Sequence, residues 1–169
     1  MLSAVLSKET CAECRFCCSF RRKSLWETPL LSEEFMKAHA VSVNGDPVMY
    51  RRYREKGFVY GQTDLEGLYK TDDPEEEIPC PFLDPDKGCA LPEDEKPFDC
   101  KIWPLRYMHM PDGKDKVCLT PTCPAINKMD VSVMEELVKK GLGDKIREYV
   151  KEHPYTTKDY REGFKVFEK

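Results

Sequence analysis

The residues with the most distinctive chemistry in this chain are four cysteines grouped near its start. Cys11, Cys14, Cys17 and Cys18 fall within eight consecutive residues, Cys-Ala-Glu-Cys-Arg-Phe-Cys-Cys. Thiolates spaced in this way on a tight turn can converge on one metal ion or cluster, whereas near-adjacent cysteines are poor disulfide partners for one another. Thiolates are soft ligands, which favours zinc, iron–sulfur clusters or Cu(I) over magnesium or calcium. The group therefore predicts a metal centre.

A second group of cysteines lies far downstream, in a stretch with unusual composition. It consists of Cys80, Cys89, Cys100, Cys118 and Cys123. Ten of the thirteen prolines lie in the same window, between Pro74 and Pro124. Proline-rich chain does not form long helices or central strands. We therefore expect an irregular, proline-rich wrap that is held in place by metal.

The cysteine spacing leaves the metal and the ligand set open. The run from Cys11 to Cys17 matches the first three ligands of a bacterial ferredoxin motif, but the fourth position falls on Arg21. Zinc ribbons use two Cys-x-x-Cys pairs, whereas the downstream cysteines are separated by eight, ten, seventeen and four residues. A fourth ligand must then be Cys18 or a distant cysteine. Nine cysteines could supply two four-cysteine sites with one left over, or one site with the others buried as small apolar residues.

Composition indicates in which cell compartment the protein is expected and which classes of partner are expected. The odd number of cysteines, nine in 169 residues, argues against a closed disulfide set, and no stretch reaches the length of a membrane span. We expect a cytoplasmic protein with no membrane partner. The net charge of −4 makes nucleic acid a poor default partner. The basic group Arg21-Arg22-Lys23 is read as a solvated turn; the alternative is that it stabilises a thiolate cluster or docks an acidic redox partner.

The elements expected around these motifs indicate one domain, residues 1–169, of the α+β class. A helix is predicted over 32–43, with Ser32 as its N-cap, and short strands over 48–60, broken at Gly57, and over 67–70. The clearest helix covers 132–152, where Ser132 and Glu135 form a capping-box pattern. The predicted architecture is a small, irregular, cysteine-rich domain. Its metal-binding blocks, 11–18 and 80–124, would pack against the helices.

Several motifs together resemble those of a known family. The run Cys11 to Cys18, followed by Cys80-Pro81-Phe82-Leu83, Gly88-Cys89, the segment from Lys96 to Pro104 and Cys123-Pro124, is similar to the pattern of the CxxCxxCC (YkgJ-type) cysteine-cluster family, described as zinc- or iron-chelating domains. Lys96 stands where the family usually has arginine.

The resemblance implies a ligand set and a cofactor. The implied ligands are Cys11, Cys14, Cys17, Cys18, Cys80, Cys89, Cys100 and Cys123, with Cys118 as a possible alternate. The family includes the cysteine-rich portion of flagellin lysine-N-methylases, which favours iron–sulfur over zinc. The aromatic neighbours Phe16, Phe82 and Trp103 are expected to help shield such a cluster from water.

Three functions compete at this point. The leading one is a protein with one or two 4Fe–4S clusters that serves electron transfer or assists a larger redox or modifying enzyme, with a protein as its partner. The first alternative is a structural zinc module that presents a protein-binding surface. The second alternative is an S-adenosylmethionine-linked modifying enzyme with an open iron site at Cys11, Cys14 and Cys17. No complete catalytic motif supports an enzyme, so catalytic residues stay unassigned.

Overall fold

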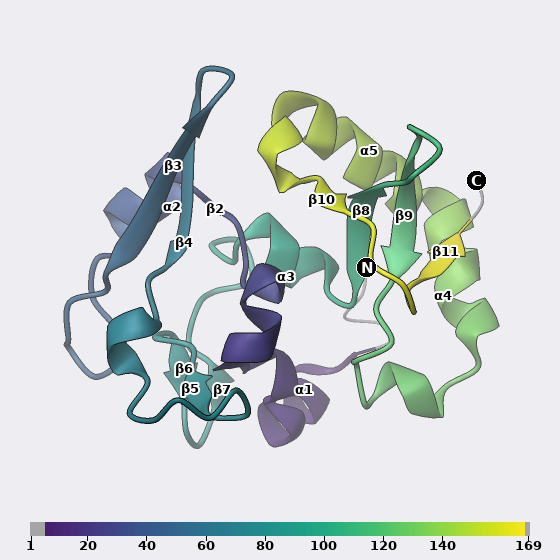
Figure 1. Ribbon diagram of the computed structural model, residues 1–169. Coiled ribbons are helices and arrows are strands. Elements are labelled where there is room, and N and C mark those ends of the chain that lie inside the picture. The colour runs from purple at the N-terminus through teal and green to yellow at the C-terminus, as the bar shows by residue number, and fades with distance from the viewer. Residues whose placement is uncertain (1–5, 168–169) are drawn as a thin grey trace. The chain divides into compact units, whose positions relative to one another are not determined.

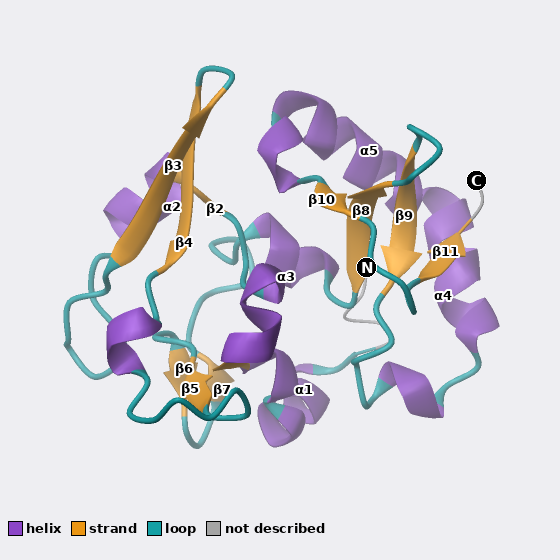
Figure 2. Cartoon of the chain, in the orientation of Figure 1, coloured by secondary structure: helices purple, strands orange, loops and turns teal. Residues whose placement is uncertain are grey.

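The fold is built from short helices and short strands joined by long loops (Figure 2). It is known from a computed structural model that describes residues 6–167. The chain divides into two compact units, with boundaries between Ser7 and Lys8 and between Lys101 and Ile102. The mixture of helices and small, mainly antiparallel sheets confirms the α+β class. Each unit is described by itself.

The first unit, Lys8–Lys101, runs from purple to teal in Figure 1. It contains all the cysteines up to Cys100. Its helices and strands are α1 (Lys8–Cys14), β1 (Ser19–Arg21), β2 (Leu31–Ser32), α2 (Glu33–Ala38), β3 (Tyr50–Glu55), β4 (Phe58–Thr63), β5 (Glu77–Pro79), β6 (Leu83–Asp84), β7 (Gly88–Cys89) and α3 (Phe98–Ile102), which ends at the boundary. Three 3₁₀ turns, at Phe16–Cys18, Arg22–Glu27 and Glu66–Leu68, lie between them.

Three small sheets organise this unit. One has the strand order β2-β4-β3, and the other two are the antiparallel pairs β1–β5 and β6–β7. The hairpin β3–β4 turns through Lys56 and Gly57, whose φ angles of 48° and 87° are those of a two-residue hairpin loop. Ser32 caps α2, because its hydroxyl oxygen accepts a hydrogen bond from the Phe35 N–H at 3.1 Å.

Two apolar clusters form the core of the first unit. One contains Leu31, Phe35, Met36 and Phe82, and the other contains Phe20, Leu65 and Ile78. Cys80 packs against both of them. The second cysteine group therefore begins at the centre of this unit and not in an exposed loop.

The second unit follows from Ile102 and contains one mixed sheet with helices. Its strands and helices are β8 (Leu105–His109), β9 (Asp115–Leu119), α4 (Val131–Leu137), α5 (Gly143–Glu152), β10 (Lys158–Asp159) and β11 (Lys165–Phe167). The sheet order is β10-β8-β9-β11, in which only the β10–β8 pair is parallel. Helix α5 packs on β8, and its buried Ile146 and Val150 belong to the predicted apolar stripe.

Three details differ from the expectations. The 32–43 helix ends at Ala38, because residues after His39 form a small ladder in which Val48 donates to the Ala40 carbonyl at 2.9 Å. The predicted strand at 67–70 is wrong, since that region begins with a 3₁₀ turn. The C-terminal helical segment is capped by Asp130, whose Oδ1 accepts from the Ser132 N–H at 2.9 Å, so Ser132 is inside the helix.

The C-terminal helical segment and the proline-rich window also differ from the expectations. A π-helical turn, Val138–Leu142, separates α4 from α5, because Gly141 takes a φ of 117° that no regular helix contains. The proline-rich window is more regular than expected, since it contains the β8–β9 hairpin. It is also divided, because the block 80–124 crosses the boundary between the units.

Candidate metal centre

The two cysteine blocks of the first unit meet at the end of one small ladder. Strand β1 pairs antiparallel with β5, with Ser19 opposite Pro79. Cys18 directly precedes β1, and Cys80 directly follows β5. The Cys80 N–H donates to the Cys18 carbonyl at 2.7 Å, which continues the ladder by one position. Backbone pairing thus brings the N-terminal cysteines beside a residue about sixty positions later.

A sharp local turn shapes the N-terminal block. Helix α1 contains Cys11 and Cys14 and ends where Arg15 adopts a left-handed φ of 53°. The Arg15 N–H closes the helix on the Cys11 carbonyl at 2.9 Å, and the Cys18 N–H bonds to the Arg15 carbonyl at 3.0 Å. The side chain of Arg15 also donates from Nε to the Ala12 carbonyl at 2.7 Å. Because these bonds hold the turn, Cys17 and Cys18 form a 3₁₀ turn beside β1.

Cys89 joins this region through a close backbone approach. It pairs with Leu83 across the β6–β7 ladder, and the Leu83 N–H in turn donates to the Cys80 carbonyl at 2.9 Å. The preceding Gly88 lies directly against Ala12 of α1, since a Cβ at Gly88 would lie 2.8 Å from the Ala12 Cβ. Only glycine permits this contact, because Gly88 also has a positive φ of 80°.

Cys80 is the most perturbed thiol of this unit. Burial raises its pKa to about 12, and the neighbouring Cys89 and Cys17 act in the same direction against a hydrogen bond from the Phe82 backbone. The thiols of Cys17, Cys80 and Cys89 are therefore close enough to influence one another. Without metal, Cys80 is a neutral thiol at physiological pH.

Lys96 lies near Cys89 and Cys100, two of the cysteines of the first unit. Burial alone would lower the pKa of Lys96, but its hydrogen bond to Glu93 and the nearby Cys89 and Cys100 raise it instead. The bond between Lys96 Nζ and Glu93 Oε2 is 2.6 Å long. Lys96 is thus a cation that lies near two cysteines. Sequence reasoning treated this residue only as a replacement for arginine in the family pattern.

A buried carboxylate fixes α3, the helix that contains Cys100. Asp99 is 1 % exposed, and its Oδ2 accepts a hydrogen bond from the Leu30 N–H at 3.0 Å. This bond ties α3 to the segment that leads into β2. Nothing in the sequence predicted this role for Asp99, because aspartate side chains usually lie on the surface.

The last two predicted ligands lie in the second unit. Cys118 is fully buried in β9, where burial raises its pKa to about 11. Cys123 is 5 % exposed and follows the same strand. The structure therefore brings Cys17, Cys18, Cys80 and Cys89 together in one unit but does not place Cys118 and Cys123 relative to them.

The cysteine side chains of the first unit fit a soft metal in kind but do not converge on a point. No disulfide joins any two of the nine cysteines, all of which lie within the described residues. Within residues 6–167, no three histidine, cysteine, aspartate or glutamate side chains are arranged to hold a metal ion. For these cysteines to bind a metal, their side chains would have to change rotamer. The backbone already places their segments near one another. Cys11, Cys14 and Cys100 are exposed, so such rotations meet little packing.

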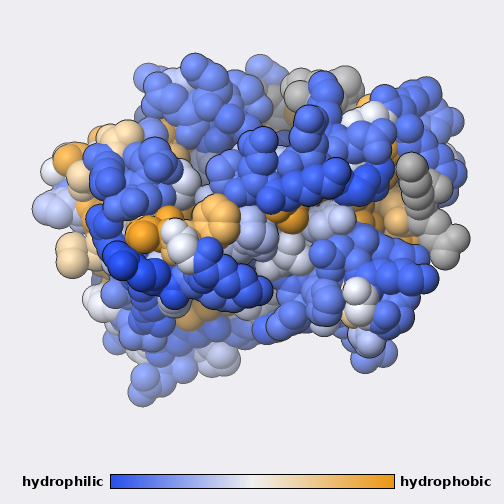
Figure 3. Space-filling model, turned by 90° about the horizontal axis from the view of Figure 1, so that it is seen from above, coloured by the Kyte–Doolittle hydropathy of each residue, from blue (hydrophilic) through white to orange (hydrophobic). Residues whose placement is uncertain are grey.

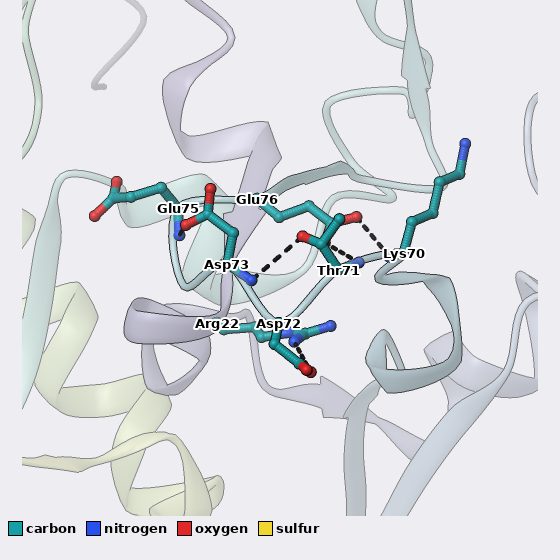
Figure 4. A network of polar contacts seen from close by, with 7 residues as sticks. All are labelled: Arg22, Lys70, Thr71, Asp72, Asp73, Glu75 and Glu76. Atoms are coloured by element: carbon teal, nitrogen blue, oxygen red, sulfur yellow. Dashed lines mark hydrogen bonds and ion pairs between the residues drawn. The ribbon is translucent and has the colours of Figure 1, made fainter.

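The basic group beside the cysteines is neutralised within the unit. Arg21 pairs with Glu77, Lys23 pairs with Glu75, and Arg22 lies 3.4 Å from Asp72. Figure 4 shows the loop that supplies Asp72 and Glu75. In it, the Glu76 carboxylate accepts from the Lys70 N–H and from both the N–H and the hydroxyl of Thr71, at 2.6–2.7 Å. These contacts favour the structural interpretation of Arg21-Arg22-Lys23.

Comparison with known proteins assigns neither a family nor a function to this chain. No family model, no curated protein and no solved structure matches the chain. Among the described helices, none combines the length and the apolar character that a membrane span requires. Seen from above, most of the visible surface is hydrophilic, with apolar residues in small groups (Figure 3).

Proposed function

We propose that this chain is a cysteine-cluster protein of the CxxCxxCC type that binds an iron–sulfur cluster in its first unit. The supporting observation is the hydrogen bond between Cys80 and Cys18, which joins the two cysteine blocks of the first unit. Cys17 and Cys89 lie next to them. Four thiols from three segments of one unit provide the number and the type of ligands that such a cluster takes.

The residues divide into ligands and residues that support them. Cys17, Cys18, Cys80 and Cys89 are the first candidates, and the exposed Cys11, Cys14 and Cys100 could supply a second set. Lys96 would offset part of the negative charge that thiolates bring, and buried Phe20 and Phe82 beside Cys80 would limit water access. When bound, the cluster would supply one-electron transfer. The protein would then pass electrons to, or assist, a larger enzyme.

The decisive experiment is purification of the full chain without oxygen, followed by iron and sulfide analysis and electron paramagnetic resonance of the reduced protein. We expect iron and sulfide in equal amounts and a visible absorption band that bleaches on reduction. A colourless protein with stoichiometric zinc under these conditions would contradict the proposal and favour the structural zinc module.

Matched cysteine variants test the ligand set. We expect Cys80→Ser and Cys89→Ser to lose iron, whereas Cys118→Ala, which changes a buried thiol of the other unit, keeps it. Cys123→Ala decides whether the second unit contributes a ligand. Retention of the full cluster by the Cys80→Ser/Cys89→Ser double variant would exclude this site.

A further inference from the structure

The hairpin β3–β4 presents a sheet edge that no other strand covers within the described residues. Strand β3 is the outer strand of the order β2-β4-β3. The hairpin extends beyond α2 and the rest of its sheet (Figure 1). It is also the longest ladder of the first unit, with six paired positions from Tyr50 to Glu55.

The register determines which backbone groups point outward. The Asp64 N–H donates to the Met49 carbonyl at 2.8 Å, so Met49 and Asp64 form a hydrogen-bonded pair. Because such pairs alternate along an antiparallel ladder, Arg51, Tyr53 and Glu55 bond inward to β4. The N–H and C=O groups of Arg52 and Arg54 then face the open edge. These groups are available to a further strand.

The charges along this edge are not balanced. Arg52 and Arg54 are exposed, and the side chain of neither one makes an ion pair or hydrogen bond with another residue in the described part of the chain. Several other cations of the unit do have an acidic partner, as in the pairs of Arg21 with Glu77, Lys37 with Glu33 and Arg51 with Glu66. In a chain of net charge −4, this edge therefore presents two uncompensated positive charges.

The two faces of β3 differ in character. Arg52 and Arg54 lie on one face, because side chains alternate along a strand. Met49, Arg51, Tyr53 and Glu55 share the opposite face. There Met49 is 68 % exposed, the Tyr53 ring contacts Tyr60 at 5.4 Å between centroids, and the charges of Arg51 and Glu55 are paired with Glu66 and Lys56. A strand added at this edge would meet the unpaired cations Arg52 and Arg54 on one side. On the other side it would meet Met49 and Tyr53, with the ion-paired Arg51 between them.

We propose that the outer edge of β3 binds an extended acidic segment of a partner protein, in which acidic side chains alternate with apolar ones. The incoming backbone pairs with Arg52 and Arg54, its carboxylates lie beside their guanidinium groups, and its apolar residues lie beside Met49 and Tyr53. A second copy of this chain is the wrong occupant, because pairing β3 with itself brings arginine against arginine. This inference is independent of the metal site.

Binding of a short peptide of alternating Glu and Val, blocked at both ends, tests the proposal at low salt. We expect the peptide to bind the full-length protein and to shift the backbone amide resonances of Arg52 and Arg54. The Arg52→Glu/Arg54→Glu variant should bind roughly tenfold more weakly or worse, since it replaces two attractive cross-strand pairs with repulsive ones. Both positions are exposed, and circular dichroism checks that the variant folds.

Three controls separate this mode of binding from its alternatives. The Lys128→Glu/Lys151→Glu variant has the same change in net charge at exposed sites of the second unit and should keep the wild-type affinity within about twofold. A Glu-Val peptide N-methylated at its Glu residues, the ones that would pair with Arg52 and Arg54, cannot form these backbone hydrogen bonds and should not bind. A single-stranded oligothymidine should bind more weakly than the peptide. Absence of peptide binding, unchanged binding after N-methylation, or preference for the oligonucleotide would each overturn the proposal.

Discussion

The backbone N–H of Cys80 donates a hydrogen bond to the carbonyl oxygen of Cys18 at 2.7 Å. This single contact closes a loop of about sixty residues and joins the two cysteine blocks of the first unit. It is held by the β1–β5 ladder and by the apolar residues Phe20 and Ile78, which pair across that ladder. The backbone at the candidate metal centre thus depends on ordinary sheet pairing and core packing, and this dependence leads to specific expectations.

The close approach of Gly88 to Ala12 should make Gly88 intolerant of a side chain. We expect Gly88→Ala to lower the free energy of unfolding in urea by more than Gly45→Ala. Both glycines have positive φ angles, 80° and 84°, so each substitution costs about 1–2 kcal/mol in backbone strain. At Gly88 the new Cβ would also lie 2.8 Å from the Ala12 Cβ, whereas nothing lies within 4 Å at Gly45. Equal losses at the two positions would show that β7 does not press against α1.

Removal of the Asp99 carboxylate should loosen α3. In Asp99→Ala the Leu30 N–H loses its acceptor in a buried environment, which we expect to cost about 1–3 kcal/mol of unfolding free energy. Asp99→Asn keeps an acceptor oxygen and serves as the control, with a smaller loss. Hydrogen exchange at the Leu30 amide provides a local readout. If that amide exchanges equally slowly in wild type and Asp99→Ala, the bond has no protective role.

The loop from Lys70 to Glu76 should make a contribution to the free energy of unfolding that depends on pH. Hydrogen bonds from the Lys70 backbone, from the Thr71 side chain and from the Thr71 backbone hold the pKa of Glu76 below its ordinary value of 4.5. The folded state therefore favours the carboxylate, so its contribution is present above about pH 4.5 and is lost as the pH falls through the lower folded pKa. We expect Glu76→Gln to be less stable than wild type near neutral pH, with a difference that shrinks in acid.

Urea unfolding of both proteins at several pH values measures this difference. Glu75→Gln is the matched control, because it removes only the exposed ion pair with Lys23. A Glu76→Gln deficit that stays constant from neutral pH down to strong acid would contradict the assigned role of the carboxylate.

The thiols of the metal-free protein should differ widely in reactivity. Burial raises the pKa of Cys80 to about 12 and that of Cys118 to about 11, so both remain neutral thiols, which are poor nucleophiles. Exposed Cys11, Cys14 and Cys100 should therefore react first with iodoacetamide. Peptide mass spectrometry at successive times gives the order of labelling. Labelling of Cys118 as fast as Cys100 would mean that β9 opens readily.

Much of the local structure follows from the sequence alone. The cysteine grouping, the hairpin at Gly57, the cap at Ser32 and the apolar stripe of the C-terminal helical segment depend on residues within a few positions of one another. Errors occur where two local signals compete. Asp130 and Ser132 are both good caps, and the helix begins after the first of them.

Tertiary structure alone decides which distant residues meet. The pairing of Cys18 with Cys80, the contact between Gly88 and Ala12 and the neutralisation of Arg21 by Glu77 each join segments more than fifty residues apart. No local propensity specifies such a partner, because the register of a ladder depends on the apolar residues that both strands bury together. The sequence therefore determined which residues could ligate a metal. The packing of Phe20, Ile78 and Phe82 around Cys80 decided which cysteine-containing segments lie side by side.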